Sequence, residues 1–280
     1  MKRHVVKAGA IAAVCLMIAL AAGCGPRRGR AQETPAKRVI VTSDTILAGI
    51  ISSLLPEERF TVSAIMPPNQ CPGHFDVKLS DIEKMRKADL AAYFSGMPFM
   101  EKARGKPGAS ISFESGSRNW MVPEVYAEGV RLVASKLSAK FPEERAGVLT
   151  KEKKVLREVE KTAERLKKEL AAAGVPGAPV LASSMQKEPL EWMGLRVVGE
   201  YGRPESLSAK DVVGLIKKGR QAGAAMVVDN MQSGPDMGES LAEALGAPHV
   251  VLTNFPSEKG YLFSLKENVR AVIDAHGKKK

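Results

Sequence analysis

The sequence predicts an α/β protein in which two β/α lobes with mostly parallel sheets are joined by one long backbone helix. Short β-branched runs alternate with amphipathic helical patterns from residue 38 to 114, one long apolar stripe follows Pro142, and the alternation resumes after Pro176. Alternation of this kind is typical of parallel sheets with crossover helices. Strand-end loops of such lobes enclose ligands, so the class favours a cleft-type binding protein.

The first lobe is predicted to span residues 38–141. The helix that follows the second strand is expected to begin at Ser80, because Glu83 three residues later completes a capping-box pattern. Alternating patterns predict strands at 38–43, 59–66, 90–95 and 109–114, and helices at 44–56, 80–89 and 123–137.

The joining helix is predicted over residues 142–174. Pro142 suits the first position of a helix, and the acidic residues that follow it suit the N-terminus. About 30 residues at ~1.5 Å each make a rod of roughly 45 Å, long enough to cross between two lobes. The apolar stripe is too short to favour a coiled coil. It comprises Val155, Leu156, Val159, Ala163, Leu166 and Leu170.

The second lobe is predicted over residues 175–280. Alternation resumes there without a detectable sequence repeat of the first lobe. Strands are expected at 179–184, 195–201, 224–230 and 249–254, with helices at 188–193, 209–222, 237–245 and 261–276.

The N-terminus is typical of a bacterial lipoprotein signal peptide over residues 1–23. A basic start precedes an apolar run at 8–22, which is short against the ~20 residues that a membrane-spanning helix needs. Small residues directly before Cys24 resemble a lipobox, so Cys24 is the expected lipidation site. A polar tether follows at 24–37. The protein is therefore expected to be extracytoplasmic and lipid-anchored to a bacterial membrane, in the periplasm or at the cell surface.

Charge and cysteine content narrow the classes of partner. Removing the first 23 of the 280 residues leaves 257 and lowers the formal charge from +11 to +8. Part of this excess lies in the terminal tails, which suit anionic lipid, and no basic stretch is interleaved with aromatic residues, so nucleic acid is not an expected partner. Cys71 is left as the only thiol without an assigned fate.

The loop at 66–76, MPPNQCPGHFD, places Cys71 and His74 three residues apart among prolines and a glycine. Three interpretations are open. The pair are metal ligands, because thiolate and imidazole suit zinc and other soft metals. Alternatively they are a nucleophile and its base, with Asp76 the nearest orienting acid. The third is that they are two unrelated residues of a turn.

Three longer stretches carry a family resemblance. Residues 65–96 read as a strand, a Pro/Gly loop with a histidine, a helix opened by Ser-Asp, and Ala-Asp before the next strand; 119–137 and 192–212 add to the match. Together they resemble the zinc/manganese solute-binding proteins of ABC importers, the family with a single backbone helix. The resemblance spans nearly the whole mature chain and implies a monomer that works with an ABC permease and its ATPase.

The resemblance also implies where ligands should lie. His74 matches the histidine of the family's first ligand loop. Arg118 stands where a second histidine is usual, and Asn254 where an aspartate is usual. The remaining position falls at Ser183, Ser184, Met185 or Gln186. The cleft candidates are therefore His74, Cys71, Arg118, Ser183, Met185 and Asn254.

The expected function is capture of a transition metal ion or a metal complex, with zinc or manganese implied by the resemblance. Arg118 points to an alternative, because a fixed cation repels a bare metal ion and attracts a carboxylate, a phosphate or an anionic chelate. The solute would then be a small anionic molecule. An adhesin-like surface lipoprotein is a further alternative. Catalysis is not expected, because no other catalytic motif accompanies Cys71 and His74.

Overall fold

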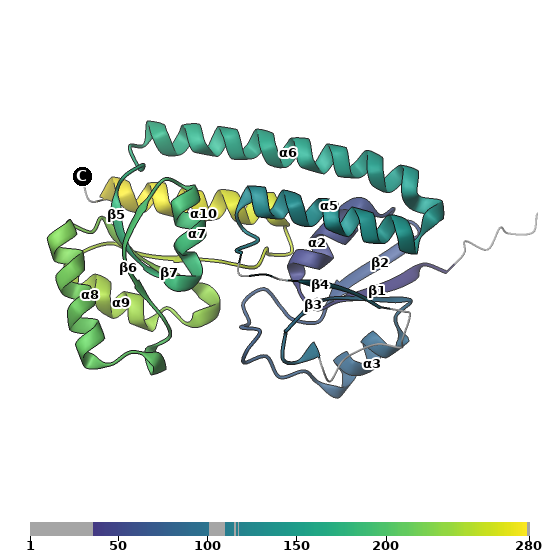
Figure 1. Ribbon diagram of the computed structural model, residues 1–280, viewed down its shortest axis with the longest axis horizontal. Coiled ribbons are helices and arrows are strands. Elements are labelled where there is room, and N and C mark those ends of the chain that lie inside the picture. The colour runs from purple at the N-terminus through teal and green to yellow at the C-terminus, as the bar shows by residue number, and fades with distance from the viewer. Residues whose placement is uncertain (1–35, 101–109, 115, 117, 279–280) are drawn as a thin grey trace, which may run out of the picture. The chain divides into compact units, whose positions relative to one another are not determined.

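Two parallel four-stranded sheets carry the structure (Figure 1). The computed structural model describes residues 36–100, 110–114, 116 and 118–278, so the predicted signal peptide and Cys24 lie outside the described residues. The strand orders are β2-β1-β3-β4 and β6-β5-β7-β8, with every pairing parallel, which confirms the predicted α/β class. No helix within the described ranges is both long enough and apolar enough to cross a bilayer.

The first sheet and its helices make up the first lobe. β1 is Arg38–Thr42, and its Ile40 and Val41 are buried. β-branched side chains pack well on both faces of a parallel sheet that is covered by helices. The other elements of this lobe are α2 Thr45–Leu54, β2 Phe60–Ala64, α3 Leu79–Lys87, β3 Leu90–Ser95, β4 Ser110–Glu114 and α5 Pro123–Lys140.

The start of α3 differs from the sequence prediction. Ser80 lies inside the helix, and Lys78 is the N-cap residue. The backbone N–H of Lys78 donates to Asp81 Oδ2 at 3.1 Å. Asp81 therefore takes the part that the sequence assigned to Glu83, because in this register Asp81 is the residue three positions after the cap.

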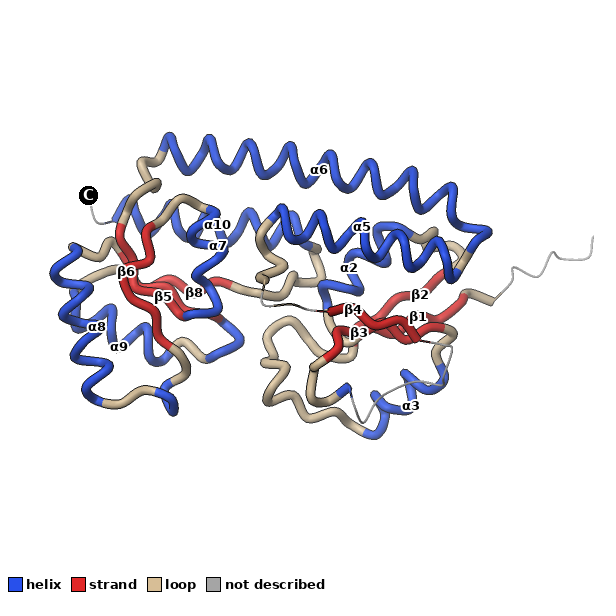
Figure 2. Tube along the Cα trace, viewed as in Figure 1, coloured by secondary structure: helices blue, strands red, loops and turns tan. Residues whose placement is uncertain are grey.

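A long helix, α6 Arg145–Ala172, follows a 3-10 turn at Pro142–Glu144. The predicted start at Pro142 is therefore a 3-10 turn, with the α-helix beginning three residues later. The buried residues of α6 include Val159, Leu166 and Leu170. Its buried side packs on α2 and α5 of the first lobe and on α10 of the second, so α6 joins the two lobes (Figure 2).

The second lobe repeats the strand order of the first. Its helices α7 and α8 follow β5 and β6, while α9 and α10 follow β7 and β8. The elements are β5 Pro179–Ser183, α7 Lys187–Trp192, β6 Arg196–Tyr201, α8 Ala209–Ala222, β7 Met226–Asn230, α9 Asp236–Leu245, β8 His249–Leu252 and α10 Tyr261–Lys278, with 3-10 turns at Ser184–Gln186, Pro204–Ser206 and Met231–Ser233.

In both sheets the strand order reverses beside the first strand of the lobe, β1 or β5. Loops leaving the carboxyl ends of parallel strands at such a reversal are the usual place for ligands in open α/β sheets. The two sheets therefore each supply one set of loops to a possible site.

Candidate functional site

A cavity of about 780 Å³ lies between the loops of the two lobes. This volume falls within the range of small-molecule sites, roughly 300–1,000 Å³. Its polar and charged lining residues are Cys71, Ser95, Arg118, Asn119, Ser183, Ser184, Glu188, Arg203, Asn230, Gln232, Ser233 and Asn254, and its apolar ones include Ile46, Phe94, Met97, Trp120, Met185 and Phe255. We call this cavity the interlobe cleft.

The turn after β2 presents Cys71 and His74 together. The His74 N–H donates to the Cys71 carbonyl at 3.0 Å, and the Gly73 N–H donates to Cys71 Sγ at 3.3 Å. These bonds close a tight turn that the Pro/Gly composition of the loop favours. The turn is attached to the sheet through the Ile65 and Met66 N–H groups, which bond to carbonyls at the end of β1.

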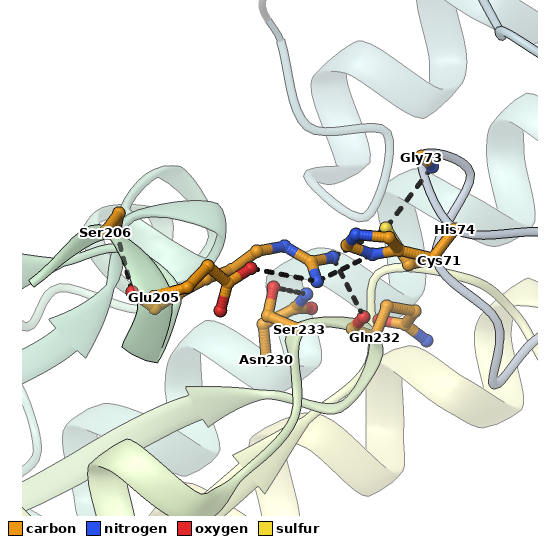
Figure 3. Close-up of polar contacts among 9 residues, drawn as sticks. Cys71, Gly73, His74, Glu205, Ser206, Asn230, Gln232 and Ser233 are labelled. Atoms are coloured by element: carbon orange, nitrogen blue, oxygen red, sulfur yellow. Dashed lines mark hydrogen bonds and ion pairs between the residues drawn. The ribbon is translucent and has the colours of Figure 1, made fainter.

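The side chains of Cys71 and His74 lie close together (Figure 3), and Arg203, in the loop after β6, contacts both. Its Nη1 lies 2.8 Å from His74 Nδ1, and its Nη2 lies 2.7 Å from Cys71 Sγ and 3.5 Å from the Gln232 carbonyl. Guanidinium has donors only, so His74 accepts at Nδ1 and is the neutral ring with its proton on Nε2. The sulfur and the ring nitrogen therefore converge on one cationic group.

Arg118 makes a second link between the lobes. Its Nε donates to Glu188 Oε1 at 2.7 Å, and the Asn119 N–H donates to Glu188 Oε2 at 2.6 Å. Glu188 is in α7 of the second lobe, so both carboxylate oxygens are held by the first lobe. The hydrogen bond and the charge of Glu188 raise the pKa of Arg118, which stays a cation.

Neutral amides line part of the cleft, namely Asn119, Asn230, Gln232 and Asn254. Asn254 Oδ1 accepts from Asn119 Nδ2 and from Gln186 Nε2, both at 2.8 Å. Gln232 Nε2 donates to the Pro68 carbonyl of the first lobe at 2.6 Å. The loop after β8 is fixed by Asn268, which both donates to and accepts from the backbone of Thr253.

The two buried aspartates near the strand ends bond within their own lobes. Asp44 caps α2 through the Ile46 and Leu47 N–H groups, and burial raises its pKa to about 6. Asp229 bonds to Tyr201 and His249, and burial likewise raises its pKa. Neither lines the cavity, so Glu188 is the only carboxylate among its described lining residues.

The sequence-predicted residues are distributed as follows. Cys71, Arg118, Ser183, Met185 and Asn254 all line the cleft, whereas His74 lies at its edge, exposed, and contacts it through Arg203. Cys71 is a free thiol. Among the described residues no hydrogen bond joins the thiol to the imidazole, because both bond to Arg203 instead.

Sequence reasoning missed Arg203, Glu188 and Gln232. Arg203 follows the end of β6 by two residues, and that position was a usable signal, since polar residues after parallel strands gather at one edge of a sheet. Within the described part of the chain, no group of three or more His, Cys, Asp or Glu residues is arranged to hold a metal ion. Among the described residues at the cleft, the thiol and imidazole that lie together are those of Cys71 and His74.

Comparison with known families gives a match over residues 40–275 to the family described as ZnuA, zinc-uptake complex component A, periplasmic. The match extends from β1 to α10 and so includes both lobes and the cleft. The chain belongs to this family. Members of this family are solute-binding proteins.

Solved structures share the fold of this ZnuA-family chain at low sequence identity. A ZnuA crystal structure is 17% identical with a TM-score of 0.73, covering 86% of this chain and 100% of that one. A manganese-bound periplasmic metal-binding protein from Candidatus Liberibacter asiaticus is 14% identical with a TM-score of 0.72, covering 86% and 100%. The laminin-binding protein Lmb of Streptococcus agalactiae, described as a bifunctional protein with adhesin and metal-transporting activity, is 16% identical with a TM-score of 0.71, covering 85% and 99%.

A curated protein also matches part of the ZnuA-family chain. It is the uncharacterized protein RP014 of Rickettsia prowazekii, 35% identical over 60 residues. The aligned segment spans 21% of this chain and 20% of that protein, so this relative adds nothing about the cleft.

Proposed function

We propose that this chain is the extracytoplasmic capture component of an ABC importer and binds a transition metal, as an ion or a complex, in the interlobe cleft. The observation that carries the proposal is the convergence of Cys71 Sγ and His74 Nδ1 on one cation, the Arg203 guanidinium, at 2.7 and 2.8 Å. Thiolate and neutral imidazole are the donors that zinc prefers, and this preference favours zinc over manganese. Metal would bind as Arg203 withdraws.

Supporting evidence comes from the family and from the geometry of the two lobes. The family is described as a zinc-uptake component, and one solved relative is a zinc-bound deletion mutant of ZnuA. In this proposal the two lobes are residues 38–141 and 175–280, joined along 142–174, and they would close on a ligand held between them. A monomer would present the loaded cleft to a permease, whose ATPase drives uptake.

The test is metal binding by the purified protein, measured by equilibrium dialysis and elemental analysis. Zinc is expected to bind at one equivalent, and Cys71→Ser and His74→Ala are each expected to weaken it tenfold or more, because each removes one of two protein ligands. His276→Gln is the matched control, since His276 lies near the end of α10. Unchanged zinc affinity in both cleft variants would sink the proposal.

Membrane attachment is a separate part of the proposal. It rests on the sequence before Cys24, which predicts cleavage after residue 23 and lipid on the new N-terminal cysteine. Mass spectrometry of the N-terminal peptide should show a lipid-modified Cys24, and Cys24→Ala should move the protein from the membrane fraction to the soluble fraction. A wild-type protein found entirely in the soluble fraction contradicts lipidation.

A further inference from the structure

We infer that the cargo of the interlobe cleft is a small polycarboxylate anion, recognised by the Arg203 guanidinium, which brings any transition metal with it as a chelate. The inference rests on the proposed function only in taking the cleft as the cargo site. Three observations lead to it: the charge of the lining, the partners of Arg203, and the number of metal donors.

The charge of the lining is positive. The described lining residues include two guanidinium groups, Arg118 and Arg203, and one carboxylate, Glu188. Glu188 has both oxygens held at 2.6–2.7 Å by Arg118 and the Asn119 N–H. The charge of Arg118 is therefore balanced by Glu188. Among the described lining residues, the formal positive charge of Arg203 remains.

The close hydrogen-bond partners of Arg203 carry no full negative charge to balance its guanidinium. Its close contacts are a thiol sulfur, a neutral imidazole nitrogen and, at 3.5 Å, a backbone carbonyl. Arg203 also forms a long ion pair with Glu205, 3.9 Å from Nη1 to Oε1, and the Glu205 side chain is 66% exposed. A guanidinium fork matches a carboxylate with two parallel charge-assisted hydrogen bonds, which none of these partners provides. A carboxylate ligand would improve on every present contact.

The metal donors are too few for a bare ion. Zinc in proteins has four ligands as a rule, and the cleft offers Cys71 and His74. A cavity of about 780 Å³ is also far larger than an ion needs. A polycarboxylate would fill this space and complete the coordination of a metal with its own oxygens. It would also pair with the Arg203 guanidinium as Arg203 moves away from Cys71 and His74.

Neutral donors around the cleft fit the same ligand. The Ser233 hydroxyl accepts from Asn230 Nδ2 at 2.8 Å, which leaves its hydrogen for an acceptor on the cargo. Ser183 and Ser184 supply two more hydroxyls on the second-lobe side. Hydroxyls bind carboxylate oxygens without adding a charge that would have to be desolvated.

The experiment is titration calorimetry of the full protein with five probes: zinc alone, citrate, nitrilotriacetate, and the one-to-one zinc complex of each. We expect at least one anion or its zinc complex to bind ten times more tightly than zinc alone. Arg203→Gln should lower that affinity tenfold or more, and Arg203→Lys should retain part of it, because a lysine keeps the charge and loses the fork. Arg196→Gln, an exposed β6 arginine, should stay within twofold.

The five probes distinguish a free anion from a zinc chelate as cargo. They also distinguish anion recognition by Arg203 from metal capture by Cys71 and His74. Equal binding of an anion with and without zinc identifies the free anion as cargo, supports the inference and counts against metal capture. Binding of the zinc complexes alone identifies a chelate and supports both. Tight binding of zinc alone, lost in Cys71→Ser and unchanged in Arg203→Gln, overturns the inference and leaves metal capture standing. Anion binding equal in the wild type and both Arg203 variants overturns it too, and binding of no probe overturns both.

Discussion

The two lobes have the same strand order but contribute different groups to the contact at Arg203. Loops of the first sheet present a thiol and an imidazole, which donate electron pairs. Loops of the second sheet present a guanidinium and a set of amides, which donate hydrogen bonds. Strand order decides where the loops meet, and the residues that follow each strand decide what the loops can bind.

The two lobes also differ in how they bind their buried strand-end aspartates, Asp44 and Asp229. In the first lobe Asp44 is used as a helix cap and bonds to Ser43. In the second lobe Asp229 is held by two side chains, Tyr201 and His249, and by the Gly238 N–H. Each lobe thus uses its strand-end aspartate for its own structure, which leaves the cleft poor in carboxylate.

The largest expected effect is in the second lobe, at Gly238. A Cβ at this position would overlap Asp229 Oδ2, which bonds to His249, and Tyr201 Oη, which bonds to Asp229 Oδ1. Gly238→Ala should therefore lower the free energy of unfolding by roughly 2–4 kcal/mol, measured by urea denaturation. Gly214→Ala, in α8 with open space around its Cβ, is the control and should gain up to about 1 kcal/mol.

The first lobe offers the counterpart, since a Cβ at Gly129 would overlap the Trp120 ring. Gly129→Ala should cost about 1–3 kcal/mol, less than Gly238→Ala, because an indole can tilt whereas a bonded carboxylate cannot move without breaking its contacts. Equal mild effects at Gly238 and Gly214 would show that the Asp229 cluster is loosely held.

The pH dependence of stability should distinguish the two aspartates. Asp44 has a pKa raised to about 6 by burial, against 3.8 for the unperturbed group. The folded state therefore binds this proton more tightly, so the stability it contributes is fully present below about pH 4 and is lost as the pH rises through about 6. The unfolding free energy of the wild type relative to Asp44→Asn should fall by roughly 2.4 kcal/mol between pH 4 and pH 7.

Asp229→Asn should show the same sign with a smaller change. Burial raises the pKa of Asp229, while its hydrogen bonds from His249 and Tyr201 favour the ionised carboxylate and act against burial. Both profiles can be measured by chemical denaturation across the pH range. A flat difference between the wild type and Asp44→Asn would contradict the raised pKa of Asp44.

Much of the fold could be predicted because each element has a local pattern of its own. The β-branched run of β1 and the apolar stripe of α6 are buried as their periodicity indicates. The contact of Arg203 with Cys71 and His74 joins residues 132 and 129 positions apart in different lobes, and no local pattern encodes it.

The start of α3 was missed for a different reason: Ser80 has the preferred side chain, but the backbone turns at Lys78, a residue type that cannot accept the capping bond.

The smallest expected change in unfolding free energy is at the N-cap residues of α3 and α8, Lys78 and Ser208. Lys78 and Ser208 have nearly the same backbone conformation, φ −81° and ψ 155° against φ −83° and ψ 159°, and each is followed three residues later by an aspartate that accepts from its N–H. Only Ser208 also accepts from the third helical N–H, at 3.3 Å from Asp211 N. Ser208→Ala should therefore cost about 1 kcal/mol of unfolding free energy.

Lys78→Ser should do the reverse in the first lobe and gain roughly 0.5–1 kcal/mol, because the new hydroxyl can accept from the Asp81 N–H. Thermal denaturation of the two variants and of the wild type is sufficient to measure both effects. Lys87→Ser, an exposed change at the other end of the same helix, controls for loss of a lysine. If Lys78→Ser destabilises the protein as much as Lys87→Ser does, then matched backbone angles are not enough to transfer a cap from one lobe to the other.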